Sequence, residues 1–225
     1  MTELAVVDLG DETGLGAISK KVLSDSESLI HGNELLADVG VVGTSARDRT
    51  GYTLAAVQAA LDGIAPPADG REFSAWDWFV DYLVLDAPIG NTDCHQEDWA
   101  VIADGGRRLA PTSDHASCLG FLLDDAERDG RLATRDRDRT VQAYAARARS
   151  KFDGSTHPCD IAHQGLSMVD AHVRDHRLER AAMIRTVEPI LGRVPARRMS
   201  PAARRFAAGV FAANRARTLP GPSVR

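Results

Sequence analysis

The chain has 225 residues, of which 44% are hydrophobic and 26% are charged, and its formal net charge is −5. A chain of this length and composition can bury a full hydrophobic core, and its acidic balance argues against a general binder of nucleic acid or of anionic membranes. No apolar run approaches the roughly 20 residues that span a bilayer, and no basic segment leads into an apolar one at the N-terminus, so we expect a globular cytoplasmic protein.

Residues 1–23 are predicted to form a small N-terminal hairpin. Residues 4–7 and 16–18 are apolar and β-prone, and turn-forming residues lie between them. Because this piece is too small to be a domain, we expect one main domain over residues 24–219. A frayed tail is expected over residues 220–225, where glycine and proline are frequent.

Three helices are predicted next. Ser24-Asp25-Ser26-Glu27 has the Ser-x-x-Glu form of a capping box and predicts a short helix through Leu36. Thr53 is expected to cap a second helix, which ends before Pro66. Ser74 is expected to cap a strongly apolar third helix. Its apolar residues follow the helical period of a buried face: Trp76, Phe79, Val80, Leu83 and Val84.

Two short strands are predicted after the apolar helix, over residues 99–103 and 107–110. Asp104-Gly105-Gly106 lies between them and tolerates the positive φ of a tight turn. A hairpin of this kind would fold Asp114 back towards Asp93 and Asp98.

The C-terminal half is predicted to be helical. Apolar spacing near the helical period predicts helices over residues 123–128, 139–149, 160–172, 178–191 and 201–217. Ser200 suits the N-cap of the last of these, and Pro189 should stop or kink the one before it. The expected fold class is mainly α within α+β: a helical bundle with a small β-hairpin.

Three aspartates carry the chemistry of this chain. Asp98 lies five positions after Asp93, the spacing that separates the catalytic aspartate of a kinase loop from the first magnesium-binding side chain. Asp114 would supply the second metal-binding acid, and carboxylates suit Mg²⁺. Taken singly, an aspartate in a loop is more often solvated or caps a turn. The pattern alone therefore leaves both interpretations open.

The segment around these acids resembles the C-terminal catalytic region of HipA-like kinases, which share the lineage of the protein and phosphatidylinositol kinases. The family pattern is Gly-Asn-x-Asp-x-His-x-x-Asn followed by a later Asp. This chain reads Gly-Asn-Thr-Asp-Cys-His-Gln-Glu-Asp from Gly90 to Asp98. The similarity continues through Leu109-Ala110-Pro111 and through residues 114–121.

The resemblance implies a role for each matching residue. Asp93 is implied to be the catalytic acid or base, and His95 to brace the catalytic loop. Asp98 and Asp114 are implied to bind metal, and together with Asn91 to bind the cofactors, which would be Mg²⁺ and ATP as co-substrate. A protein-kinase-like C-lobe is the implied fold.

Two departures from the family pattern have expected consequences. Asp98 stands where the family has Asn, which should make the site more electronegative. Pro88 removes a backbone donor and is expected to break the helix before the loop. A kinase also needs a Gly-rich loop and a strand lysine, and Lys20 and Lys21 are poor candidates for that lysine. We therefore expect the chain to begin after the N-lobe.

The expected activity is ATP- and Mg²⁺-dependent phosphoryl transfer to a hydroxyl, with a protein Ser or Thr as the acceptor. One alternative is a truncated kinase or pseudokinase that binds or regulates without turnover. Another is one half of a split kinase whose partner chain supplies the N-lobe. An antitoxin-like partner, as in toxin–antitoxin systems, is implied by the family alone. The chain has 24 Arg and three Lys, which indicates the codon bias of a GC-rich genome, and a bacterial source is implied by the family alone.

Other polar residues give weaker signals. The three cysteines are odd in number and far apart, which argues against a disulfide framework. Ser117 and Cys118 suggest a nucleophile only superficially, because no His-Asp pair is arranged around them; packing and turn capping are expected. The segment His31-Gly32-Asn33-Glu34 is expected to help order the region near the site.

Overall fold

A computed structural model describes residues 21–43, 45, 47–67, 70 and 72–219, and the backbone of residues 2–8 and 13–19. Strands β1 (Thr2–Asp8) and β2 (Thr13–Ser19) pair antiparallel, which confirms the N-terminal hairpin. The tail over residues 220–225 lies outside the described residues, so its fraying stays a prediction.

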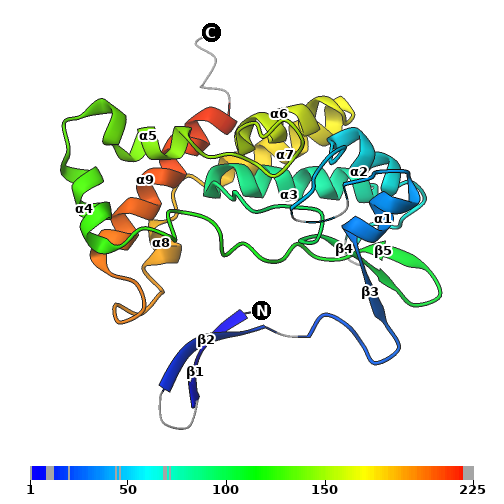
Figure 1. Cartoon of the computed structure of the whole chain (residues 1–225), viewed down its shortest axis with the longest axis horizontal. Helices are drawn as coiled ribbons and strands as arrows, with labels where there is room; N and C mark the ends of the chain where they lie inside the picture. Colours follow the sequence, from blue (N-terminus) through cyan, green and yellow to red (C-terminus); the bar gives the residue numbers. More distant parts are fainter. Residues whose placement is uncertain are drawn as a thin grey trace.

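A three-stranded antiparallel sheet has the order β3-β4-β5. Its strands are β3 (Ser28–His31), β4 (Ala100–Ala103) and β5 (Arg107–Leu109). The predicted hairpin of β4 and β5 is confirmed, and Gly105 turns the chain between them with φ 91°. The sequence did not predict β3, which adds a strand on the other side of β4 (Figure 1).

The helix predicted from Ser24 to Leu36 is wrong in its first half. The Glu27 carboxylate does accept a hydrogen bond from the Ser24 backbone N–H at 2.6 Å, but this contact closes a turn. The chain then extends, because Ile30 pairs with buried Val101 of β4 and packs against the core. Helix α1 (Gly32–Asp38) begins only after His31, whose backbone N–H donates to the Glu34 side chain at 3.1 Å.

The two following helices confirm their predicted caps. Helix α2 (Leu54–Ala60) begins after Thr53, whose Oγ1 accepts from the Ala56 backbone N–H at 3.2 Å. Helix α3 (Ala75–Ile89) begins after Ser74, which forms a capping box with Asp77. The apolar residues predicted for one face of α3 are all buried: Trp76, Phe79, Val80, Leu83 and Val84.

Pro88 does not break α3, contrary to the expectation from sequence. It lies in the last turn, and the helix continues to Ile89 before Gly90 ends it in the left-handed conformation with φ 64°. A proline costs most in the middle of a helix, where the hydrogen bond it removes is flanked by others. Only Ile89 follows Pro88 in α3, so the missing hydrogen bond interrupts no further turn of the helix.

The C-terminal half is helical, as predicted, but its boundaries differ. The sequence predicted helices over 160–172 and 178–191, with the break between them. In the structure the break lies earlier, at residues 168–170. Pro189 lies in the first turn of a separate short helix, where its missing N–H costs little. The Ser200 cap is confirmed. The helices are α4 (Asp125–Ala133), α5 (Val141–Ala146), α6 (Pro158–Ser167), α7 (Ala171–Met183), α8 (Glu188–Leu191) and α9 (Pro201–Thr218), with a 3-10 turn at Arg137–Arg139.

Helix α3 is the central element of the helical body and contacts α6, α7 and α9 (Figure 1). The sheet β3-β4-β5 lies with α1 and α2 at one end, and α4, α5 and α8 lie beside α9 at the other. Among the described residues, no helix has the length and apolar character needed to cross a membrane. The fold is mainly helical with a small sheet, and the end of α3 delivers the chain into the middle of the molecule.

Candidate active site

The loop over residues 91–98 connects α3 to β4 and contains most of the predicted site. Gly90 makes the turn into it with φ 64°, a conformation that side chains rarely adopt. A Cβ atom on Gly90 would lie 2.7 Å from Nδ2 of Asn214 in α9. The absence of a side chain at Gly90 therefore lets α9 pack directly against the start of the 91–98 loop.

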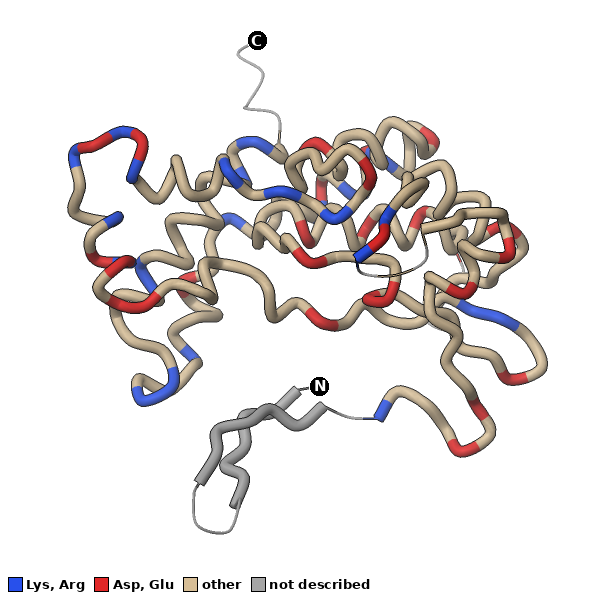
Figure 2. Tube along the Cα trace, in the orientation of Figure 1, with Lys and Arg blue, Asp and Glu red and all other residues tan. Residues whose placement is uncertain are grey.

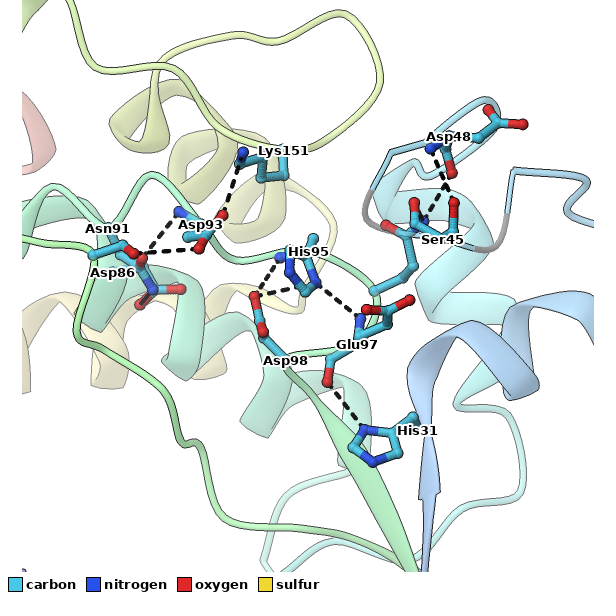
Figure 3. Close-up of polar contacts among 12 residues, drawn as sticks. His31, Ser45, Asp48, Asp86, Asn91, Asp93, His95, Glu97, Asp98 and Lys151 are labelled. Atoms are coloured by element: carbon cyan, nitrogen blue, oxygen red, sulfur yellow. Dashed lines mark hydrogen bonds and ion pairs between the residues drawn. The ribbon is translucent and has the colours of Figure 1, made fainter. Parts of the chain in front are cut away.

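Asp86 anchors the beginning of this loop from inside α3. It is 5% exposed, and its Oδ1 accepts a hydrogen bond from Asn91 Nδ2 at 2.9 Å. Asn91 Oδ1 in turn accepts from the Asp93 backbone N–H at 3.1 Å (Figure 3). Burial raises the pKa of Asp86, and the Asn91 hydrogen bond and the nearby His115 ring oppose that rise. Both the nitrogen and the oxygen of the Asn91 side-chain amide therefore make hydrogen bonds that hold the loop. The assignment of Asn91 to cofactor binding stays a prediction.

Asp93 presents a partly exposed carboxylate at the centre of the site. Lys151 Nζ lies 3.3 Å from Asp93 Oδ1, and the Ser117 hydroxyl donates to Asp93 Oδ2 at 3.2 Å. The Asp93 side chain is 45% exposed, so a hydroxyl group from outside can reach it. The ammonium group of Lys151, which points at this carboxylate in Figure 3, and the hydroxyl of Ser117 fix its orientation.

His95 is held within the hydrogen bonds of its own loop. Its backbone N–H donates to Asp98 Oδ2 at 2.9 Å, and its Nδ1 accepts from the Glu97 backbone N–H at 3.2 Å. Nδ1 also lies 3.3 Å from Asp98 Oδ2, but a nitrogen that accepts from Glu97 carries no proton to give to a carboxylate. We therefore assign the backbone N–H, rather than an ion pair, as the contact that holds Asp98.

Asp98 and Asp114 are near enough for their charges to interact. Burial is the largest cause of the raised pKa of Asp98; the His95 backbone hydrogen bond opposes it, and the carboxylates of Asp114 and Asp93 raise it further. Asp114 is exposed and has φ 54°, a conformation unusual for a residue other than glycine. The structure thus brings the three predicted acids into one electrostatic environment.

Carboxylates such as those of Asp98 and Asp114 suit Mg²⁺ in a nucleotide site, and their binding of it stays a prediction. The described residues contain no group of three or more His, Cys, Asp or Glu side chains arranged to hold a metal. Mg²⁺ in phosphoryl-transfer sites takes only one or two carboxylates, together with phosphate oxygens and water. The mutual repulsion of Asp98 and Asp114 is what a shared cation would relieve. Two protein ligands are therefore chemically sufficient.

Gln96 ties the 91–98 loop to Gly43, Ser45 and Asp48. Its side chain is fully buried, and Nε2 lies within hydrogen-bonding distance of the carbonyl oxygens of Gly43, Ser45 and Asp48. On the other side of the loop, the Glu97 carbonyl oxygen lies 3.0 Å from His31 Nδ1. The expectation that the segment beginning at His31 helps to order the site is confirmed by this contact.

The cysteines near the site are not activated. Burial raises the pKa of Cys94, and burial together with the Asp86 charge raises the pKa of Cys118 to about 11. A thiol with a raised pKa is protonated at neutral pH and is a weak nucleophile. This agrees with the expectation that Cys118 has a packing role.

Of the two lysines considered for ATP, Lys21 forms an exposed ion pair with Asp25 at 3.0 Å, and Lys20 lies outside the described residues. Sequence reasoning missed Lys151, which reaches Asp93 from the connection between α5 and α6. It also missed Asp86. Asp86 could have been found, because an acid among the apolar residues Leu83, Val84 and Ala87 indicates a buried polar role. Nothing in the sequence placed Lys151 beside Asp93.

The whole fold resembles that of a known kinase. The chain superposes on the crystal structure of the Helicobacter pylori proinflammatory kinase CtkA with a TM-score of 0.64 and 18% sequence identity, over 93% of this chain and 71% of that one. No protein-family model and no curated protein sequence matches the chain. The predicted fold class is confirmed: a mainly helical, kinase-like α+β fold with a small antiparallel sheet.

Proposed function

We propose that this chain is the catalytic C-lobe of a HipA-like kinase that transfers the γ-phosphoryl group of ATP to a Ser or Thr hydroxyl of a protein. The observation that carries the proposal is the carboxylate of Asp93, partly exposed and oriented by Lys151 and Ser117. This carboxylate lies in a fold similar to that of a kinase. The HipA-like motif from Gly90 to Asp98 supports the narrower family.

Each residue has a distinct task in the proposed reaction. Asp93 accepts a hydrogen bond from the acceptor hydroxyl, orients it and receives its proton as the bond from the acceptor oxygen to the γ-phosphorus forms and the bond from that phosphorus to the bridging oxygen of the departing ADP breaks. Asn91 and the His95–Asp98 contact hold the loop that carries Asp93. Asp98 and Asp114 would hold Mg²⁺, which neutralises charge on the phosphate oxygens when bound. Catalysis on this proposal depends mainly on positioning and electrostatics.

The test is phosphate transfer from radiolabelled ATP with Mg²⁺ to a protein acceptor. Asp93→Asn and Asp114→Asn should each reduce transfer by at least about 1,000-fold, since each removes a group on which the transition state depends. Asp62→Asn, an exposed aspartate between α2 and α3, is the matched control and should retain full activity. Equal transfer by the wild type and both site variants would refute the catalytic role.

A second candidate is a binding module without turnover, or the half of a split kinase that needs an N-lobe chain. The observation in its favour is that Lys21 pairs with the exposed Asp25 rather than with a residue of the site. Calorimetric titration with Mg²⁺-ATP separates the candidates. Binding without transfer supports the module, and transfer that appears only when an N-lobe protein is added supports the split enzyme.

A further inference from the structure

A cavity of about 540 Å³ opens beside Asp93, on the side of Thr92 and Ser117. Its walls come from the segment after Asp114, from α5 and the connection to α6, and from α9. Among the residues that the structure describes, five cationic side chains and no acidic ones line it: Arg49, Arg131, Arg147, Arg149 and Lys151. In a chain whose net charge is −5, this is a marked local concentration of positive charge.

Most of these cations have no carboxylate partner among the residues with described side chains. Among the described residues, these two arginines donate only to backbone carbonyl oxygens: Arg147 to that of Asp138 at 3.0 Å, and Arg149 to those of Ala148 at 2.8 Å and Ala146 at 3.3 Å. Within the described part of the chain, Arg49 forms no ion pair. Figure 2 shows the basic residues that follow one another along the connection between α5 and α6. The positive charge of this wall is therefore available to an anion from outside.

Arg131 adds a buried donor to the same cavity. Its guanidinium lies 5.3 Å from the centre of the Tyr144 ring, and its Nη1 is buried without a hydrogen-bond partner among the described residues. A buried donor that lacks a partner destabilises a folded protein, and a bound anion offers such a partner. Arg131 is thus held in place by an aromatic ring while part of its hydrogen-bonding capacity is unused.

The apolar part of the cavity suits a peptide. Phe121 is 49% exposed and Leu122 is 78% exposed, and Tyr144 and Val210 also contribute to the walls. Exposed apolar side chains can contact the aliphatic part of a glutamate or aspartate side chain, while the neighbouring cations contact its carboxylate. A nucleic acid would call for a longer basic stripe, which the acidic balance of the chain does not favour.

We infer that this cavity binds acidic side chains of the polypeptide that carries the acceptor hydroxyl. The inference rests on the proposed function, in which that hydroxyl approaches Asp93. Lys151 lies at the boundary, since it contacts Asp93 and also lines the cavity. Its ammonium group therefore lies between the proposed catalytic carboxylate of Asp93 and the cavity that binds acidic side chains. The preferred acceptor is a Ser or Thr flanked by Glu or Asp.

The first test measures binding without turnover. Fluorescence anisotropy of a labelled Glu-Glu-Glu-Ser-Glu-Glu peptide with the full chain should show binding that weakens as salt is added, and a Lys-for-Glu counterpart should bind at least about 10-fold more weakly. Arg49→Glu combined with Arg149→Glu should weaken binding of the acidic peptide about 10-fold or more. Arg185→Glu, an exposed arginine outside the cavity, should change binding by less than about twofold.

Three results would overturn the inference: equal affinity for the two peptides, unchanged binding by the double variant, or tighter binding of a single-stranded oligonucleotide than of the acidic peptide. Circular dichroism of the double variant, compared with Arg185→Glu, shows whether its fold is intact. If the fold is lost, Arg49→Ser and Arg149→Ser are measured singly, and each should weaken acidic-peptide binding about two- to fivefold.

The second test separates this inference from the proposed function. Asp93→Asn should lose transfer and keep its preference for the acidic peptide in the anisotropy measurement. If transfer survives in Asp93→Asn while the peptide preference holds, the catalytic assignment fails and the acidic-peptide site stands. If transfer is lost but both peptides bind alike, the kinase proposal stands and the acidic-peptide site fails.

Discussion

Lys151 Nζ lies 3.3 Å from Oδ1 of Asp93, although Asp93 follows α3 and Lys151 follows α5. The position of the predicted catalytic carboxylate thus depends on a segment outside the motif that identifies it. This contact makes Lys151 the first residue to test after the acids themselves.

Replacing Lys151 by Met should lower kcat for phosphate transfer about 10-fold or more, because Asp93 loses the cation that orients it. The melting temperature should change little, since a pair in which the lysine side chain is 33% exposed contributes at most about 1 kcal/mol. Lys21→Met, which removes an exposed pair with Asp25, is the control. An unchanged kcat in Lys151→Met would show that Asp93 is oriented without the lysine.

Replacing Asn91 by Ala should destabilise the fold by about 1–3 kcal/mol, because it leaves the buried Asp86 without its amide donor. The loss should be larger near neutral pH than in acid. Burial raises the pKa of Asp86 in the folded state, so its contribution to stability is present below the unfolded pKa and is lost as pH rises through the folded pKa. Without the Asn91 hydrogen bond, the pKa of Asp86 in the folded state rises further, so more stability is lost at neutral pH.

Urea denaturation at several pH values measures this effect. Asp86→Asn combined with Asn91→Ala has no carboxyl at position 86 and serves as the control. The added pH dependence should disappear in it. A pH dependence that persists would place its origin in another group.

Replacing Gly90 by Ala should cost more than the same change at Gly105. Both glycines have positive φ, 64° and 91°, so an alanine is strained by roughly 1 kcal/mol at either position. Around Gly105 no atom lies within 4 Å of the added Cβ, whereas at Gly90 Asn214 Nδ2 lies 2.7 Å away. We expect about 1 kcal/mol for Gly105→Ala and about 2–3 kcal/mol for Gly90→Ala in chemical denaturation. Equal losses would mean that Asn214 moves aside freely.

Replacing Gln96 by Leu should loosen residues 43–48 more than the rest of the fold. The carbonyl oxygens of Gly43, Ser45 and Asp48 all lie close to the one amide nitrogen of Gln96, so they lose a shared donor together. Limited proteolysis should cut this segment at least several-fold faster, with a smaller change in global stability. Thr53→Ala, which removes the cap of the adjacent helix, is the comparison. Unchanged cleavage would indicate that other contacts hold the segment.

Local signals in the sequence identified the elements whose ends are chemically marked. Thr53, Ser74 and Ser200 were predicted caps, and each accepts the expected backbone hydrogen bond. The apolar face of α3 was equally readable, because its period reflects burial. Ser24 and Glu27 misled the prediction, since the same local contact can close a turn when the next residues pair with a strand far along the chain.

The loop that contains the predicted site could also be identified from the sequence, but the residues that hold Asp93 in place could not. The spacing of Asp93 and Asp98 is a local property, and so is the His95 contact with Asp98. Lys151 and Ser117 reach Asp93 only after α5 and the segment beyond Asp114 have packed. Such contacts are set by tertiary packing, which a single sequence does not report.

Asp114 has a backbone conformation that glycine would adopt with less strain. Because glycine adopts this positive φ without the strain of a side chain, Asp114→Gly is an early candidate for an engineer who optimises this chain for thermal stability alone. The same change would delete one of the two carboxylates proposed to hold Mg²⁺. Selection for a higher melting temperature and selection for phosphate transfer would therefore favour different residues at this position, and a screen should score both properties together.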